Sequence, residues 1–245
     1  MEPQLKPVPL QNGRNAPSGW ASTGSGTTVT LDTNNVLRNT YWLLALSMLP
    51  TIFGAYVGSS MDFAAFYRTS PIMAPLLMFG AMFGMLFVVS ALRNSAWGIA
   101  AVFGFTFVSG IMLAPMLQHA AGLRNGGQLV ALAGGMTAAV FLVMATIATV
   151  TKRDFSFMGK FLFIGVILLI VASLANMFFQ VPALALTISA IAVMIFSAYI
   201  LFDISQIVNG GETNYVMATM SLYLDIYNIF INLLNLLMAF SGERD

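Results

Sequence analysis

Residues 221–235, SLYLDIYNIFINLLN, combine an apolar segment with a regular series of polar side chains. The polar positions recur at intervals of four, three, four and three residues, and they are Ser221, Asp225, Asn228, Asn232 and Asn235. This spacing places all five side chains on one face of an α-helix. A polar face of this length is costly against lipid hydrocarbon, so we expect this helix to lie at the centre of a helical bundle.

The rest of the chain has the composition of a membrane protein. Of its 245 residues, 58% are hydrophobic and 8% are charged, whereas about a quarter of the residues in soluble domains are charged. A membrane span needs about 20 apolar residues. Seven such segments follow one another, at about 38–57, 71–92, 96–117, 128–150, 157–179, 183–208 and 215–240. We therefore predict an all-α membrane protein, a bundle of seven transmembrane helices with helix seven at its centre.

The N-terminal residues differ from this membrane domain, which we assign to residues 36–245. The stretch GRNAPSGWASTGSGTT, residues 13–28, is rich in Gly, Ser, Thr and Asn and has almost no aliphatic side chains. Such a segment buries too little apolar surface to offset the entropy lost on ordering. We therefore expect residues 1–35 to form a flexible tail.

The basic residues predict the orientation in the membrane, because cytoplasmic loops carry an excess of Lys and Arg. One side of the predicted bundle holds Arg38, Arg93, Lys152, Arg153 and Lys160, and the other holds Arg68, Arg124 and Arg244. The first side carries more basic residues, so we expect the N-terminus in the cytoplasm. With seven spans, the C-terminus is then periplasmic.

The residue inventory excludes several classes of function. The chain has no cysteine, which excludes disulfides and thiol catalysis, and its only histidine, His119, excludes a site with several histidine ligands. HExxH and Walker motifs are absent, and the net charge of +1 offers no general attraction for nucleic acid. Intramembrane aspartyl proteolysis is the one enzymatic alternative left, but LYLDIY lacks the GxGD motif of presenilin-type enzymes. We predict no catalytic site, no bound metal and no cofactor.

Two acids lie inside hydrophobic spans, where a carboxylate costs about 2.5–3.5 kcal/mol on insertion scales. They are Asp203, in AYILFDISQIV, and Asp225, in SLYLDIYNIF. Each is expected to face the bundle interior and to have a partner. Two simpler interpretations stay open: Asp203 is a helix-end acid that reaches the interface, and the polar residues of the last helix are interhelical hydrogen-bonding groups without a ligand.

The two acids are expected to lie close together, because they are at similar depths in adjacent helices. At 1.5 Å per residue, Asp203 and Asp225 lie roughly 7 Å and 15 Å from the end that the two antiparallel helices share. Two adjacent carboxyls in low dielectric resist ionising together and tend to share a proton. Tyr199 and Gln206 lie on the same helix face as Asp203 and are candidate donors to it. Arg93 is either the cation that neutralises the pair or an ordinary positive-inside anchor.

Several segments resemble the Bax inhibitor family, the transmembrane Bax inhibitor motif proteins. FGFTFVSGIMLAPML resembles the family's third helix, AYILFDISQIVNGG its sixth and SLYLDIYNIFINLL its signature last helix. The segments VLRNTYWLLAL and NGGETNYVMATMSLY resemble its bacterial YccA-type branch in particular. The resemblance covers nearly all of the chain after the tail.

The resemblance implies a seven-helix bundle in a bacterial inner membrane, in contact with the lipid bilayer. In the family, an aspartate pair and an arginine govern a pH-sensitive calcium leak. Asp203 and Asp225 match the two acids, Arg93 matches the arginine approximately, and calcium would be the transported ion. YccA-type proteins are substrates and modulators of FtsH, a membrane-anchored AAA protease. The expected function is therefore modulation of FtsH, with a pH-sensitive cation leak as the alternative; Tyr199, Gln206, Ser221, Asn228 and Asn232 are expected to support the acids.

Overall fold

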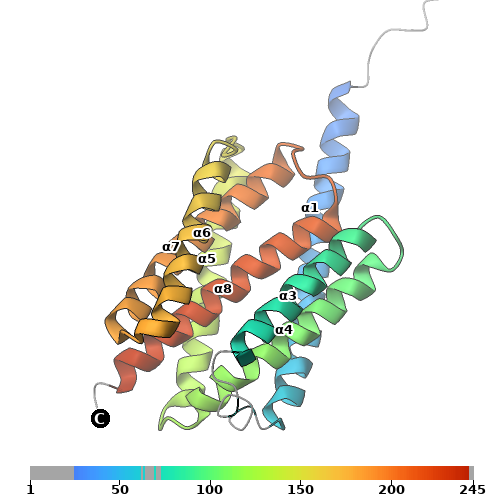
Figure 1. Ribbon diagram of the computed structural model, residues 1–245. Coiled ribbons are helices and arrows are strands. Elements are labelled where there is room, and N and C mark those ends of the chain that lie inside the picture. Colours follow the sequence, from blue (N-terminus) through green and yellow to red (C-terminus); the bar gives the residue numbers. More distant parts are fainter. Residues whose placement is uncertain (1–24, 62, 64–68, 70–72, 243–245) are drawn as a thin grey trace, which may run out of the picture.

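The computed structural model describes residues 25–61, 63, 69 and 73–242, and within them the chain forms α-helices and no strand (Figure 1). The helices are α1 (Ser25–Ser59), α3 (Met73–Leu92), α4 (Gly98–Ala121), α5 (Gly126–Thr151), α6 (Met158–Phe179), α7 (Pro182–Val208) and α8 (Tyr215–Gly242). The prediction of an all-α protein is confirmed. Consecutive helices run in alternating directions, so the first turn of α1 and the last turn of α8 lie at opposite ends of the bundle (Figure 1).

Six of the described helices are long and apolar enough to cross a membrane. They are α4 to α8 and the part of α1 from Thr33 to Ser59. In α3, the apolar segment Leu76–Leu92 is shorter than the others. The protein is therefore a multi-pass membrane protein by the length and composition of its helices.

The N-terminal boundary of the first helix differs from the prediction. Residues 1–24 of the expected tail lie outside the described residues, whereas residues 25–35 form the first turns of α1. Adding a residue to an existing helix costs far less than starting a new one. No proline interrupts α1 before Pro50, so the helix that begins in the apolar span continues outward to Ser25.

A proline and a glycine mark the ends of α7. Pro182 occupies the first turn, where its missing N–H costs nothing. At the other end, Gly210 has φ of +76°, a left-handed conformation that favours glycine. Two further prolines, Pro50 and Pro115, lie inside α1 and α4.

Glycines bring α1 and α4 into backbone contact. A Cβ atom added to Gly54 would overlap the carbonyl oxygen of Phe107, and one added to Gly110 would overlap the carbonyl oxygen of Thr51. At Gly58, an added Cβ would lie 2.7 Å from the Cβ of Ala114. Small residues allow this close approach of membrane helices, and α1 packs more extensively on α4 than on any other described helix.

The last helix contacts most of the others. α8 runs between α7 on one side and α3 and α4 on the other, and it also packs on α1 and α5 (Figure 1). Most of the largest fully buried side chains come from α7 and α8, and they include Ile200, Ile204, Ile207, Leu222, Tyr223, Ile229 and Leu234. α7 and α8 therefore supply most of the largest side chains of the buried core.

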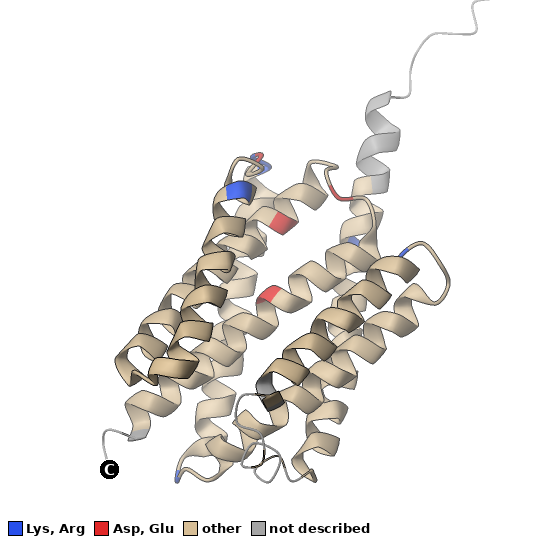
Figure 2. Cartoon of the chain, in the orientation of Figure 1, with Lys and Arg blue, Asp and Glu red and all other residues tan. Residues whose placement is uncertain are grey.

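The outer faces of the helices are apolar as well. On α6, Phe161, Phe163 and Leu168 are each more than 60% exposed, an arrangement that suits lipid and not water. Most Lys, Arg, Asp and Glu residues of the described chain lie near the ends of the helices (Figure 2). The exceptions include the acids of α7 and α8 described below.

Candidate functional site

Asp203 and Asp225 come together in the interior of the bundle. Asp203 lies on α7, five residues before its end, and Asp225 lies on α8, ten residues after its start. Because the two helices are antiparallel neighbours, the carboxyl groups are within hydrogen-bonding distance of each other. Asp203 is partly buried, and Asp225 is 4% exposed.

The contact between the two carboxyls needs a positive charge or a proton. An ionised carboxylate only accepts hydrogen bonds, so two ionised carboxylates side by side repel each other. The Oδ2 atom of Asp225 is buried and accepts no hydrogen bond from any described donor. The site is therefore complete only when the pair shares a proton or when a cation or donor approaches Asp225.

A cavity of about 590 Å³ adjoins both acids. Five helices line it, and its walls are mainly apolar and aromatic. α3 contributes Met78, Phe79, Met82, Phe83 and Leu86; α4 contributes Met112; α6 contributes Val166 and Ile170; α7 contributes Phe196, Tyr199 and Asp203; and α8 contributes Ser221, Leu224, Asp225, Tyr227, Asn228 and Ile231. The acids thus lie in the wall of a mainly apolar space.

The polar residues of α8 continue along this space. Ser221 and Asn228 line the cavity with the acids, as does Tyr199 of α7. Asn228 and Asn232 also line a second cavity of about 330 Å³. The two cavities share Phe79, Phe196 and Asn228, among others, so they lie next to each other along α8.

The asparagine side chains are satisfied in different ways. Asn228 and Asn232 donate to carbonyl oxygens of α8 itself, those of Leu224 and Asn228, each at 2.8 Å. Only Asn235 bridges to another helix, where it donates to the hydroxyl of Ser189 on α7 at 2.9 Å. Of these three asparagines, Asn235 therefore fits the interpretation as an interhelical hydrogen-bonding group.

Two expected site residues lie elsewhere. The side-chain amide of Gln206 donates to the hydroxyl of Ser156, at 2.7 Å, and not to Asp203. Gln206 is almost one turn nearer the helix end than Asp203, so its long side chain reaches the polar loop between α5 and α6. Arg93 is exposed just after α3, and its carbonyl accepts a hydrogen bond from the Asn214 side chain at 3.2 Å.

Within the described part of the chain, no ion pair joins Arg93 to either aspartate. Arg93 lies at the same end of the bundle as the loop between α7 and α8, because Asn214, which donates to its carbonyl, belongs to that loop. A role for Arg93 in neutralising the pair stays a prediction.

A third acid and an aromatic wall belong to the site and were not predicted from the sequence. Glu212, in the loop between α7 and α8, lies close enough to Asp203 for the two charges to interact. Phe79 and Phe83 on α3 lie with ring centroids 4.6 Å apart and line the cavity. Their spacing of four residues marks a shared helix face, but in a helix that is apolar on all sides it does not show which face is inward.

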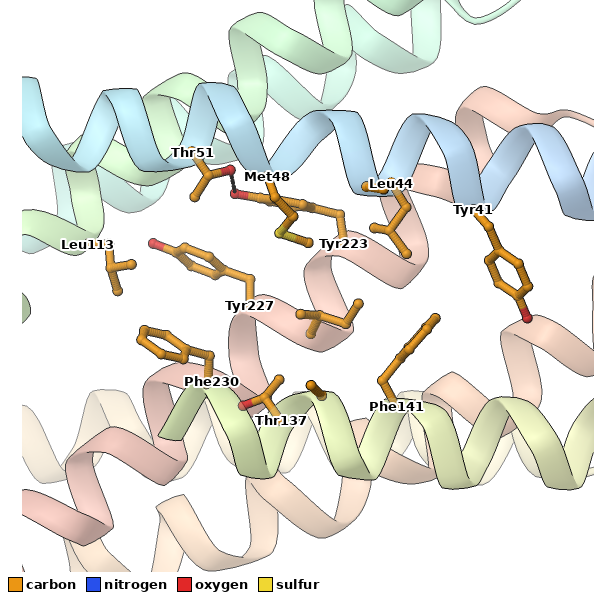
Figure 3. Close-up of a pocket in the computed structure, with 14 residues that line it drawn as sticks. Tyr41, Leu44, Met48, Thr51, Leu113, Thr137, Phe141, Tyr223, Tyr227 and Phe230 are labelled. Atoms are coloured by element: carbon orange, nitrogen blue, oxygen red, sulfur yellow. Dashed lines mark hydrogen bonds between the residues drawn. The ribbon is translucent and has the colours of Figure 1, made fainter. Parts of the chain in front are cut away.

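A separate crevice of about 470 Å³ lies between α1 and α5, with α8 behind it (Figure 3). Its lining is almost entirely apolar and includes Leu44, Met48, Phe141 and Phe230. On its inner side, the hydroxyls of Thr51 and Tyr223 are hydrogen-bonded at 2.9 Å (Figure 3). The Tyr227 hydroxyl donates to the carbonyl of Ser109 at 3.0 Å. These bonds tie α8 to α1 and α4.

Fold and site together define a class: a polytopic helical membrane protein with a buried carboxyl pair between its last two helices. The chain belongs to the Bax inhibitor family, described as "Inhibitor of apoptosis-promoting Bax1", whose pattern matches residues 33–242. The resemblance seen in the sequence is thereby confirmed.

Bacterial relatives are similar to this chain along most of its length. "Modulator of FtsH protease YccA" of Escherichia coli K12 is 39% identical over 209 residues, 84% of this chain and 91% of that protein. A membrane protein of Vibrio cholerae is 41% identical over 208 residues, 85% of this chain and 91% of its own length. A further Escherichia coli relative, 39% identical, is described as "Inner membrane protein YccA".

Proposed function

We propose that this chain is a non-enzymatic protein of a bacterial inner membrane that binds the membrane protease FtsH, modulates it and is itself degraded by it. The observation that carries the proposal is the 39% identity to the FtsH modulator YccA across 91% of that protein.

The proposal includes a topology. All seven described helices span the membrane, α8 is the central one, the N-terminus is cytoplasmic and the C-terminus is periplasmic. The alternating helix directions and the contacts of α8 with five other helices support this arrangement.

Packing offers a physical route to modulation. An ATP-driven protease that pulls on the N-terminal end must first separate α1 from α4, and these helices meet through Gly54, Gly58 and Gly110. The Thr51–Tyr223 hydrogen bond adds a link from α1 to α8. A substrate that resists this separation occupies the protease for a long time and so slows the degradation of others.

Co-purification from native membranes tests binding. Protein tagged at the C-terminus is expected to recover a proteolytically inactive FtsH, and a multi-pass protein of similar size and expression level serves as the control. Recovery of FtsH at the level of the control would contradict the proposal.

A second candidate function is a pH-sensitive cation leak, with calcium as the ion. The contact between Asp203 and Asp225 favours it, because loss of their shared proton adds repulsion between α7 and α8. Tyr199 lies within electrostatic range of both acids, and Glu212, in the adjoining loop, adds negative charge near Asp203. The adjoining cavities along α8 supply space for a path.

Calcium flux into liposomes that contain the purified protein, measured from about pH 5 to pH 8, tests this candidate. The wild type is expected to leak in a pH-dependent way. Asp225→Asn, which keeps the shape and removes the repulsion, is expected to leak without a pH response, whereas the exposed loop variant Asp154→Asn should match the wild type. Identical pH profiles for wild type and Asp225→Asn, or no flux from either, would eliminate the leak.

A further inference from the structure

The cavity beside the carboxyl pair combines one negative site with apolar walls. Two touching carboxyls that share a proton carry a single negative charge. None of the described residues that line the cavity is basic, and the Oδ2 atom of Asp225 has no described donor. A ligand that complements this space therefore brings one positive charge or hydrogen-bond donor and an apolar body.

The walls favour an ammonium group as that charge. Aromatic rings line the cavity from three helices: Phe79 and Phe83 from α3, Phe196 and Tyr199 from α7, and Tyr227 from α8. A ring face attracts an ammonium group, and the attraction grows when the cation leaves water. Tyr199 lies within electrostatic range of both carboxyls, so one aromatic residue and the acids can act on the same cation.

A bound divalent cation such as calcium fits this cavity less well than an ammonium group does. Calcium takes six to eight oxygen ligands in its sites. The described residues contain no group of three or more His, Cys, Asp or Glu side chains that could hold a metal ion. Many of the residues that line the cavity, such as Met78, Met82 and Ile170, present carbon or sulfur and not oxygen.

The size and position of the cavity suit a small amphiphile from the bilayer. Its volume of about 590 Å³ lies within the 300–1,000 Å³ typical of ligand pockets. Phe79 and Phe83, on its α3 wall, are 48% and 43% exposed, so the wall reaches the outer surface of the bundle. Asp225 lies about 15 Å along α8 from its first residue, deeper than the headgroup of a bilayer lipid, and the phosphate of such a headgroup would be repelled by the acids.

We propose that this cavity binds a hydrophobic amine, with its protonated ammonium group between Asp225, Asp203 and the aromatic rings and its aliphatic chain along α3 and α6. This site does not depend on FtsH binding. The proposal of an amine site therefore holds or fails whether or not the chain binds FtsH. Occupation would place a cation against the one buried oxygen of the pair that lacks a donor, and it would join α3 to α7 and α8.

Photocrosslinking tests the site directly. The protein, in nanodiscs of phosphatidylcholine, is exposed to an alkylamine that carries a diazirine on its chain, and the labelled peptides are identified by mass spectrometry. Label is expected on the cavity walls of α3 and α6, at least about tenfold above that from the matched diazirine alcohol. Excess dodecylamine should abolish it, whereas dodecanol, calcium ions and added phosphatidylethanolamine should not.

Variants connect the label to the acids. The double variant Asp203→Asn, Asp225→Asn removes the negative charge and keeps the shape, and it is expected to lose at least about nine-tenths of the label. Asp154→Asn, a change of an exposed loop acid, should keep it. Equal labelling by the amine and the alcohol in the wild type would overturn the proposal even if the double variant fails to fold, as would competition by calcium or phosphatidylethanolamine in place of dodecylamine.

Discussion

Asp203 and Asp225 face each other because neither can face lipid. A carboxylate in hydrocarbon has no water to solvate it, so its helix turns that position towards the bundle interior. Two helices that each do so, at similar depths and in antiparallel contact, bring their acids together. The result is a pair whose charge depends on a proton or a cation, and on this property both the leak and the amine site depend.

An exposed acid provides the contrast. Asp154, in the loop between α5 and α6, accepts hydrogen bonds from the hydroxyl and the backbone N–H of Ser156, and these lower the pKa of Asp154 below its ordinary value of 3.8. A lowered pKa in the folded state contributes stability above the ordinary pKa, and this is lost as pH falls through the folded-state value.

We therefore predict that Asp154→Asn alters the pH dependence of unfolding only below about pH 4. Thermal unfolding of the detergent-solubilised protein, measured from about pH 3 to pH 8, checks this. The variant and the wild type should give parallel curves above about pH 5. Curves that diverge near neutral pH would show that the loop acid titrates there and is unsuitable as a control for the buried pair.

Single residues also show what the sequence can predict about the site. Asp203 and Asp225 could be identified because a charge in an apolar span has few acceptable positions. Phe79 and Phe83 could not, because lipid and protein core are equally apolar and leave no contrast between inward and outward faces. Gln206 was expected as a donor to Asp203, but its long side chain donates to the Ser156 hydroxyl instead.

At the scale of helices, the closest contact is between α1 and α4. Gly54 and Gly110 lie against backbone atoms of the opposite helix, so even a methyl group would force the two helices apart. By contrast, an added Cβ at Gly134 on α5 meets no atom within 4 Å. Glycines that look alike in the sequence thus have different structural roles.

We predict that Gly110→Ala destabilises the protein by about 1–3 kcal/mol, the usual cost of overpacking. Gly134→Ala, the matched control, should leave stability unchanged or raise it slightly, because alanine favours the helix. Unfolding in mixed micelles of increasing denaturing detergent measures both. If Gly110→Ala were as stable as the control, α1 and α4 would not be in backbone contact.

The lengths of the elements were predictable to different degrees. α7 agrees closely with its predicted span because Pro182 and Gly210 mark its ends. The start of α1 was not predictable in this way, since residues 25–35 have a loop-like composition but continue an existing helix. A composition that disfavours starting a helix does not prevent extending one.

At the scale of the whole molecule, the alternating helices divide the loops between two ends. The loops that follow α3, α5 and α7 lie at the end where α1 begins (Figure 1). Arg93, Lys152 and Arg153 belong to these loops. In the proposed topology this end is the cytoplasmic one, as the positive-inside rule predicts.

This topology predicts the outcome of reporter fusions. An alkaline phosphatase fused after residue 245 should be active, because that enzyme needs the periplasm, whereas fusions at residue 154 or 210 should be inactive. A green fluorescent protein at the same positions should give the opposite pattern. Fluorescence of the green fluorescent protein fused after residue 245, with no phosphatase activity there, would contradict this topology.

Modulation of FtsH is tested most directly by the rate at which purified FtsH degrades a membrane substrate in liposomes, with and without this protein. We expect the protein to slow degradation of the other substrate in proportion to its amount while it is itself degraded slowly. Gly110→Ala should be degraded faster and inhibit less, because α1 separates more easily from α4. An unchanged rate of substrate degradation at a molar excess of this protein over FtsH would contradict the account.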